Sequence, residues 1–377
     1  MINNFLYFDN AATTKPSKEI LDFYSSIESD QFANPNSVHR LGVKANSLLD
    51  KARESILNSF KCQNHRVIFT SSATEANNLA IKGYCLAHKN RGNHIITTSI
   101  EHPSVLETFK QLEQFGFEVT ILPVNNDGII SLDDLKSSIK NSTILVSAMA
   151  VNNEIGSINP IEDIASIISK YPKIVFHVDT TQAIGKTNLP YDKIDMFVVS
   201  SHKIHGIKNS GALIVKKGIE LMPLLSGGGQ EDGFRSGTQS VALALTLAKV
   251  ISKETTLLDK KNIHVSELYS LAKSELKKID YIVINDSNYP SFYILNFSLL
   301  SKKASVVVEA LSNRGIYVST VSACHSKKEK MSYVLKAMGK NDLVSSNSIR
   351  LSFDESNTKN EIFSFVNELK NILESIK

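Results

Sequence analysis

The chain has 377 residues, of which 42% are apolar, and this length and composition are enough to bury a large core. Its 42 basic and 38 acidic residues are interleaved and give a net charge of +4, which argues against a protein that binds nucleic acid or an anionic membrane. No apolar run approaches the roughly 20 residues of a membrane-spanning helix, and the N-terminal MINNFLYFDN lacks the pattern of a signal peptide, so we expect a cytoplasmic protein.

Short apolar runs alternate with segments of helical spacing between about residue 65 and residue 216. This alternation is typical of a mostly parallel sheet covered by helices on both faces, and it predicts an α/β fold. The runs that we interpret as strands are 66–71, 94–99, 117–124, 143–150, 173–179, 195–201 and 212–217, and the helical spacing is clearest at 104–115 and 161–171.

A second, smaller unit follows this sheet. Residues 238–279 are interpreted as two helices that lead the chain away from it. Because no repeat, low-complexity tract or proline-rich linker separates the two units, we expect them to pack tightly together. The elements predicted for the smaller unit are strands at 280–286, 291–299, 316–319 and 346–353, and helices at 304–315 and 359–376.

Polar residues follow the predicted strands, where ligands collect in an open α/β sheet. Segment 71–75 opens a helix with hydroxyl and backbone N–H groups that suit a phosphate, although such a segment alone is more often an ordinary N-cap. Each of the other polar residues, taken singly, is most simply a cap or a satisfied polar group. These are Glu101 and His102, Asn152, Asn153 and Glu154, Asp179 and Gln182, and the segment 200–206, SSHKIHG.

Together these residues make a set that suits an aldehyde cofactor of the pyridoxal phosphate type. Such a cofactor needs a lysine amine to bind its aldehyde and a carboxylate to keep its ring nitrogen protonated. It also needs a phosphate cradle and a flat group over its ring. The candidates for these four roles are Lys203, Asp179, the 72–75 turn with Ser200 and His202, and His102.

The chain resembles the cysteine desulfurases of the NifS/IscS type, within the class V aminotransferase group of fold-type I pyridoxal phosphate enzymes. Ten motifs stand in the expected order between residues 8 and 353: FDNAATTKP, NPNSVHRLG, FTSSATEANNLAIKG, EHPSVLET, VNNEIG, HVDTTQAIGK, SSHKIHG, GGGQEDGFRSGT, VSACHS and SNSIRLSF. The resemblance implies a large domain, 16–254, that binds pyridoxal phosphate on a mostly parallel seven-stranded sheet. It also implies a small α+β domain, formed by 1–15 and 255–377, that carries the loop of the catalytic cysteine.

The resemblance also implies a role for each matching residue around the cofactor. Lys203 would bind the cofactor covalently, and His102 would stack on its ring and take part in catalysis. Asp179 would contact the ring nitrogen of the cofactor, and Gln182 would contact its phenolic oxygen. The residues that would contact its phosphate are Ala73, Thr74, Ser200 and His202.

Three further matches concern the substrate and a second subunit. Asn153, beside the cofactor, and Arg350 would hold the substrate carboxylate, for which a bidentate guanidinium is the best geometric fit. Thr238 matches a threonine that reaches the phosphate of the neighbouring subunit's cofactor. The resemblance therefore implies a homodimer.

The three cysteines are too few and too scattered for a disulfide framework or a zinc cluster. Cys62 and Cys85 are interpreted as small buried apolar groups. Cys324 lies in the polar segment STVSACHSKKEKMS, where His325 and three lysines favour the thiolate electrostatically. It matches the family's catalytic cysteine.

The implied reaction converts L-cysteine to L-alanine. The Lys203 amine, alone or with His102, would move the α-proton, and the Cys324 thiolate would attack the substrate sulfur and hold it as a persulfide. The persulfide would pass to an acceptor, either an iron–sulfur scaffold or a tRNA-thiolation enzyme.

The sequence leaves other functions open: an aminotransferase or a selenocysteine lyase of the same family, and a non-catalytic scaffold. A desulfurase requires Cys324 for activity, whereas an aminotransferase does not. A preference for selenocysteine over cysteine as substrate would identify a selenocysteine lyase. A colourless purified protein would support a scaffold. The chain also departs from the family pattern at Val321, Asp232 and His325, where glycine, arginine and threonine are common.

Overall fold

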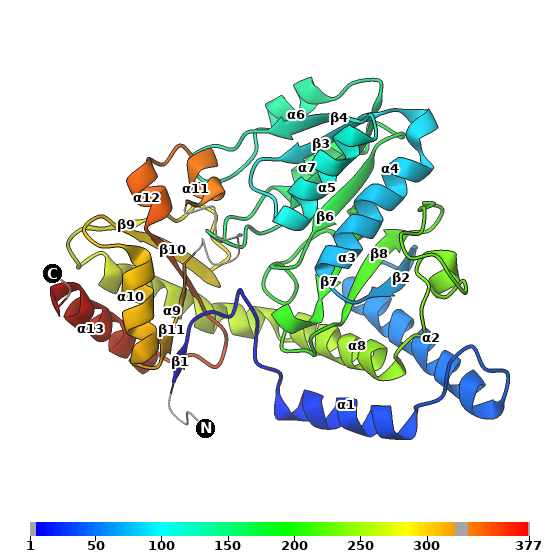
Figure 1. Cartoon of the computed structure of the whole chain (residues 1–377), viewed down its shortest axis with the longest axis horizontal. Helices are drawn as coiled ribbons and strands as arrows, with labels where there is room; N and C mark the ends of the chain where they lie inside the picture. The colour runs from blue at the N-terminus through cyan, green and yellow to red at the C-terminus, as the bar shows by residue number, and fades with distance from the viewer. Residues whose placement is uncertain (1–4, 321–330, 376–377) are drawn as a thin grey trace.

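The computed structural model describes residues 5–320 and 331–375. Figure 1 shows two lobes, a larger one around the longest sheet and a smaller one at the left, with helices α8 (Val241–Thr256) and α9 (Leu258–Leu276) running from one to the other. These are the two helices predicted within 238–279, and that prediction is confirmed. The domain boundaries at residues 16 and 254 stay a prediction.

The predicted mostly parallel sheet is confirmed in the large lobe. In the described residues it has seven strands in the order β2-β8-β7-β6-β5-β3-β4, and β8 runs antiparallel to both of its neighbours. The strands are β2 (His65–Thr70), β3 (His94–Thr98), β4 (Glu118–Leu122), β5 (Thr143–Met149), β6 (Val175–Asp179), β7 (Met196–Ser200) and β8 (Gly211–Lys216).

Helices cover both faces of this sheet, which explains why its strands are continuous apolar runs. In β7, Phe197 and Val199 pack into the core on one face, whereas Met196 and Val198 pack into the core on the other. The first face carries α2 (Arg40–Phe60), α7 (Ile161–Ile168) and α8, and the second carries α3 (Ala73–Asn78), a π-helical segment (Leu79–Gly83), α4 (Tyr84–Ala87) and α5 (Pro103–Gln114).

The small lobe is built on an antiparallel sheet with the order β12-β13-β10-β9. Its core packs against α9, α10 and α13. The elements are β9 (Ile282–Ile284), β10 (Ile294–Leu299), β12 (Ser319–Thr320), β13 (Ser348–Ser352), α10 (Ala304–Asn313) and α13 (Lys359–Ser375).

The prediction of a single strand over 316–319 is wrong. The chain changes partner at Val318: β11 (Ile316–Tyr317) pairs in parallel with β1 (Leu6–Tyr7), whereas β12 pairs with β13. The remaining elements are α1 (Lys18–Asp30), α6 (Leu132–Ser138), α11 (Tyr333–Ala337), α12 (Asp342–Ser346) and the 3₁₀ turns Lys89–Arg91, Tyr191–Lys193, Ser201–Lys203 and Glu231–Gly233. None of the helices in the described ranges has both the length and the apolar character that crossing a bilayer requires.

The N-terminal segment after β1 links the two lobes. Asp9 forms a bridge with Ser352 of β13, and the Ala11 N–H donates to the Ser352 hydroxyl at 2.9 Å. A few residues later, the Thr14 N–H donates to the His202 carbonyl at 2.8 Å. The segment therefore crosses from the small sheet to the turn that follows β7 in the large one.

Candidate active site

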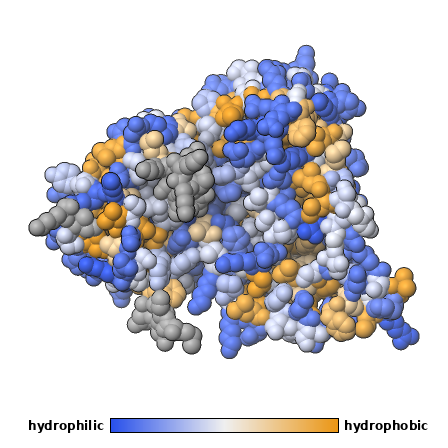
Figure 2. Space-filling view, in the orientation of Figure 1, coloured by the Kyte–Doolittle hydropathy of each residue, from blue (hydrophilic) through white to orange (hydrophobic). Residues whose placement is uncertain are grey.

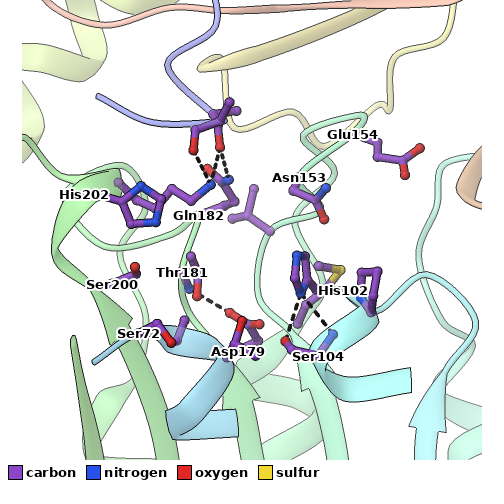
Figure 3. Close-up of a pocket in the computed structure, with 18 of the residues that line it drawn as sticks. Ser72, His102, Ser104, Asn153, Glu154, Asp179, Thr181, Gln182, Ser200 and His202 are labelled. Atoms are coloured by element: carbon purple, nitrogen blue, oxygen red, sulfur yellow. Dashed lines mark hydrogen bonds between the residues drawn. The ribbon is translucent and has the colours of Figure 1, made fainter. Parts of the chain in front are cut away.

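Ten of the predicted site residues line one cavity of about 270 Å³. The large lobe contributes the ends of β6 and β7, the small sheet contributes Thr320 and Arg350, and α11 contributes Tyr333. Figure 3 shows that side chains from several elements turn toward this space. The ten are Ala73, Thr74, His102, Asn153, Asp179, Gln182, Ser200, His202, Lys203 and Arg350.

Lys203 lies in the 3₁₀ turn directly after β7. Its ammonium group donates to the backbone carbonyls of Ala11 at 2.6 Å and Ala12 at 2.9 Å. Gln182 donates to the same Ala11 carbonyl at 2.9 Å and accepts a hydrogen bond from Lys186 at 3.2 Å. The N-terminal segment thus holds both the predicted cofactor-binding lysine and the predicted partner of the phenolic oxygen.

Asp179 is the last residue of β6 and is 5% exposed. Its Oδ1 accepts from the Thr181 N–H at 2.9 Å, and its Oδ2 accepts from the Asn77 amide, also at 2.9 Å. These two donors compensate the burial of a carboxylate. The structure therefore supports a charged group at the position predicted for the partner of a ring nitrogen.

The predicted phosphate turn opens helix α3. Ser72 caps the helix, since its hydroxyl accepts from the Glu75 N–H at 3.2 Å. Gly211 allows this turn to lie against β8, because a Cβ atom there would come within 3.1 Å of the Ser72 carbonyl carbon. The N–H groups of the first turn have no partners within the helix and suit an anion.

His202 lines the same cavity as this turn, and its Nδ1 is hydrogen-bonded to the Thr13 hydroxyl at 3.1 Å. Burial, and then the positive charge of Lys203, lower the pKa of His202 to about 4. The ring is therefore neutral at physiological pH and is available as a hydrogen-bonding partner for a phosphate oxygen.

His102 is the N-cap of α5, and its ring is fixed at one edge. Its Nδ1 accepts from the Ser104 N–H at 3.1 Å and lies 2.8 Å from the Ser104 hydroxyl, as the two dashed lines in Figure 3 indicate. Pro103 follows as the first helical residue, where its missing N–H is not needed.

Arg350 reaches the cavity from β13 of the small lobe and is 3% exposed. Its two terminal nitrogens donate to the Asn153 carbonyl at 2.8 Å and to Asp9 Oδ1 at 2.9 Å. Within the described residues, Arg350 Nε and Asn153 Oδ1 are buried and have no hydrogen-bond partner. Such groups are what a bound carboxylate or cofactor would satisfy.

The donor set fits pyridoxal phosphate. Lys203 offers an amine, Asp179 a carboxylate, the first turn of α3 an anion site, and His102 a flat ring, all at one cavity. The unpaired Arg350 Nε and Asn153 Oδ1 leave polar groups for a ligand at the same place. This chemistry matches the four requirements of the cofactor.

One predicted site residue, Thr238, is not part of this group. Thr238 lines a separate cavity together with Ser71, Glu231 and Arg235. Cys324 lies outside the described residues, as do Val321 and His325. The role of Thr238 with a neighbouring subunit and the role of Cys324 as nucleophile stay predictions.

The interpretation of Cys62 and Cys85 as buried thiols is confirmed. They are 2% and 0% exposed. Burial raises the pKa of Cys62 to about 12 and raises the pKa of Cys85 as well. Neither thiol is suited to act as a thiolate nucleophile.

The sequence interpretation missed several residues that hold the site in place. The Ala11 and Ala12 carbonyls act through the backbone, which no side-chain pattern reveals. Asn77 lies inside a matched motif, but nothing in the motif marks its contact with Asp179. Ser104, in the first turn of a predicted helix, has the pattern of a capping residue and gives no sign of its contact with His102.

Glu101 precedes His102 and is fully buried. Its Oε1 accepts from the Thr98 hydroxyl at 2.7 Å and from the Met149 N–H at 2.8 Å, whereas Oε2 has no partner in the described part of the chain. Burial is the main cause that raises the pKa of Glu101 to about 8, and the two hydrogen bonds oppose it. The carboxyl group is therefore mostly protonated at neutral pH.

This pKa predicts a pH-dependent effect of Glu101→Gln on stability. Because an unfolded glutamate ionises near pH ~4.3, the folded protein keeps a proton that the unfolded chain has lost between about pH 5 and pH 8. The contribution of Glu101 to stability therefore falls as the pH rises through this window. Glutamine keeps the Oε1 acceptor but does not titrate. The melting temperature of the variant minus that of wild type should therefore increase by several degrees from pH 5 to pH 8.

The matched control is Glu107→Gln, whose side chain is 72% exposed. Its melting temperature relative to wild type should stay nearly constant over the same range. A constant difference between Glu101→Gln and wild type would contradict a raised pKa for Glu101.

Comparisons with known proteins agree with this geometry. The sequence pattern of the family described as aminotransferase class-V matches residues 6–365. A NifS/IcsS protein homolog from Lactobacillus delbrueckii subsp. bulgaricus is 42% identical over 96% of this chain and 95% of its own length. A cysteine desulfurase IscS from Ehrlichia chaffeensis is 40% identical over 100% of this chain and 92% of its own. A solved NifS-like protein superposes with a TM-score of 0.93 and 35% identity, covering 99% of this chain and 100% of that chain.

Proposed function

Because the chain belongs to the class V aminotransferase family, in its NifS/IscS cysteine desulfurase group, we propose that it converts L-cysteine to L-alanine and transfers the sulfur to one of its own cysteines. The observation that carries the proposal is the meeting of Lys203, Asp179 and His102 at one cavity. These are the groups that the reaction requires around its cofactor.

The cofactor is pyridoxal 5′-phosphate. When bound, it supplies an aldehyde that links covalently to an amine and a protonated ring that accepts the electron pair left by the α-proton. Lys203 would hold the aldehyde, and the carboxylate of Asp179 would hold the proton on the ring nitrogen. Gln182 would donate to the phenolic oxygen, and Ala73, Thr74, Ser200 and His202 would hold the phosphate.

Lys203 would also move the α-proton of the substrate. Its Nζ lies within hydrogen-bond distance of two backbone carbonyls, which restrict where the amine can go when it is released. A neutral amine can accept the α-proton and return it later to the methyl-forming end of the substrate. The carbonyls of the N-terminal segment would thus keep the base close to its target.

Arg350 and Asn153 would bind the carboxylate of L-cysteine. The guanidinium is already held by Asp9 and by the Asn153 carbonyl, so its orientation is set before the substrate arrives. Arg350 Nε and the remaining N–H bonds of the guanidinium can donate to a carboxylate. A preset guanidinium binds without a large loss of side-chain entropy.

Cys324 would attack the sulfur of the bound substrate. The thiolate forms a new S–S bond while the C–S bond breaks, so that the carbon part keeps the electron pair of the broken bond and leaves as alanine after protonation. Cys324 then carries the sulfur as a persulfide. The polar, lysine-rich sequence around Cys324 supports this role, since it favours a thiolate.

The test of the proposed function is to add L-cysteine and a thiol reductant to the purified protein with pyridoxal phosphate. We expect alanine and sulfide in equal amounts, because the reductant releases each transferred sulfur. An aminotransferase would need an α-keto acid acceptor and would release no sulfide. A selenocysteine lyase would act on selenocysteine and leave cysteine unchanged. Either result would contradict the proposal.

We also propose that the protein is a homodimer in which Thr238 reaches the partner's cofactor. Its place outside the main cavity agrees with such a role. Apolar side chains are exposed around the α1–α2 connection, at the lower right of Figure 2, and a cluster of this kind favours a protein–protein contact. They are Phe32 (76% exposed), Val38 (97%), Leu41 and Val43.

The dimer predicts a mass in solution of twice the chain's 41.6 kDa, measured by light scattering after size exclusion. Val38→Asp should weaken the dimer, because it would bury a charge in the contact. Thr238→Ala should instead leave the dimer intact and weaken cofactor binding. A wild-type monomer that binds the cofactor normally would contradict this arrangement.

The persulfide sulfur is proposed to pass to an iron–sulfur scaffold or to a tRNA-thiolation enzyme. Incubation of the protein with radiolabelled cysteine and each candidate acceptor would identify which one takes up the label. Absence of label on both would contradict this delivery.

A further inference from the structure

A chain of hydrogen bonds connects Asp179 with His102 beneath the cavity. The Asn77 amide nitrogen lies 2.9 Å from Asp179 Oδ2 and 2.9 Å from the Ser104 hydroxyl, and this hydroxyl lies 2.8 Å from His102 Nδ1. Asn77 is fully buried, Ser104 is 9% exposed and Asp179 is 5% exposed. The connection is therefore largely shielded from water.

Asp179 sets the direction of this chain. A carboxylate can only accept hydrogen bonds, so the Asn77 side chain must turn its NH₂ group toward Asp179. The opposite orientation would place the Asn77 carbonyl oxygen against a carboxylate oxygen. Asn77 Oδ1 has no partner among the described residues that would favour that orientation.

The orientation of Asn77 then decides what Ser104 does. Both hydrogens of the Asn77 NH₂ group are used, one toward Asp179 and one toward the Ser104 oxygen. That oxygen accepts from Asn77, and the single hydroxyl hydrogen of Ser104 remains available to donate to His102 Nδ1.

A second donor meets the same nitrogen. The Ser104 backbone N–H donates to His102 Nδ1 at 3.1 Å, and a backbone N–H cannot reverse its direction. Two donors therefore face Nδ1, which must present a lone pair. The hydrogen of the neutral ring then resides on Nε2, at the opposite edge of the imidazole.

We propose that Asn77 and Ser104 are positioning residues through which the carboxylate of Asp179 fixes His102 in the tautomer that carries its hydrogen on Nε2. In this form His102 offers a hydrogen-bond donor through Nε2, and its one ring lone pair, on Nδ1, already accepts hydrogen bonds from Ser104 and does not serve to remove a proton. The removal of the α-proton is then assigned to Lys203 alone. This assignment of roles rests on the proposed function, whereas the tautomer itself does not.

The wild-type holoenzyme tests the tautomer directly. With nitrogen-15-labelled histidine, the two-bond proton–nitrogen correlations of His102, assigned by comparison with His102→Gln, should show a hydrogen on Nε2 and a lone pair on Nδ1. A hydrogen on Nδ1 would overturn the proposal. The spectrum is recorded without L-cysteine, so its outcome is independent of whether the protein releases alanine and sulfide.

Ser104→Ala tests the connection to Asp179. It removes the hydroxyl donor and keeps the backbone donor, so the His102 nitrogen signals should move toward the average of the two tautomers. We expect kcat to fall about tenfold with little change in KM, as for the loss of one hydrogen bond. Ser104→Thr, which restores the hydroxyl, should restore the wild-type signals.

The matched control is Thr108→Val, which removes another buried hydroxyl from α5, one turn further along. The Thr108 hydroxyl is hydrogen-bonded to the Ser104 carbonyl and to Asn78 Oδ1, not to His102, in the described structure. Its variant should keep the wild-type nitrogen signals of His102. Wild-type signals in Ser104→Ala, or a shift of equal size in Thr108→Val, would overturn the role of Ser104.

Discussion

Replacing Cys324 with serine is expected to abolish sulfide release and to leave the cofactor bound. A serine hydroxyl cannot accept a sulfur atom, and no cofactor contact proposed here involves Cys324. The variant should stay yellow and still change its absorption spectrum when L-cysteine is added. Alanine and sulfide formation should fall by about three orders of magnitude or more, the scale seen when a nucleophile is removed. A combined alanine and sulfide assay measures the loss.

Cys62→Ser and Cys85→Ser are the matched controls, since both thiols are buried and unsuited to form a thiolate. Both variants should still release sulfide, although the buried hydroxyl will lower their stability. Mass spectrometry of the wild type after incubation with L-cysteine should find one extra sulfur on the peptide that contains Cys324. Wild-type turnover by Cys324→Ser, or the extra sulfur on either buried cysteine, would refute the proposed nucleophile.

The meeting of the cavity residues was predictable because sheet geometry determines it. Each apolar run is long enough to be a buried strand, and the carboxyl ends of parallel strands lie along one edge. Asp179 ends β6, Lys203 follows the adjacent strand β7, and His102 follows β3, so all three lie at the carboxyl edge of one sheet. Patterning of this kind needs no knowledge of side-chain packing.

The contacts beneath the cavity depend on packing and could not be predicted. Asn77 and Ser104 are 27 residues apart and meet because α3 and α5 lie side by side on the same face of the sheet. Helical periodicity predicts that each helix buries one face, but it does not say which polar side chain of one helix will oppose which side chain of the other. The tautomer of His102 is therefore a property of the fold.

The pairing partners of the short strands could not be predicted from the sequence either. The apolar run at 316–319 is typical of a strand, yet the chain pairs first with β1 and then with β13. Pairing of this type is decided by the N-terminal segment, which lies more than 300 residues away in the sequence. That segment also supplies the Ala11 and Ala12 carbonyls that hold Lys203.

Borohydride reduction is expected to attach the cofactor permanently to Lys203 and to no other lysine. The reagent reduces the double bond between the lysine nitrogen and the cofactor carbon, which makes the attachment stable to digestion. Lys203 is the lysine that lines the cavity in the described structure. Lys186 is the lysine most suited to test whether labelling is specific for Lys203. Its Nζ is hydrogen-bonded to Gln182, which lines the same cavity.

Lys203→Ala should therefore yield no labelled peptide and should lose activity by several orders of magnitude, since it removes both the covalent anchor and the base that moves the α-proton. Lys186→Met should still be labelled at Lys203, because the Lys186 amine is hydrogen-bonded to Gln182 and does not belong to the set that lines the cavity. Peptide mapping by mass spectrometry distinguishes the two lysines. Label on Lys186 in the wild type, or a Lys203→Ala protein that still forms a reducible linkage, would mean that the turn after β7 does not carry the cofactor. The geometry argues against that outcome, because the amine of Lys203 alone combines a place at the cavity with an anchor on the N-terminal carbonyls among the described residues.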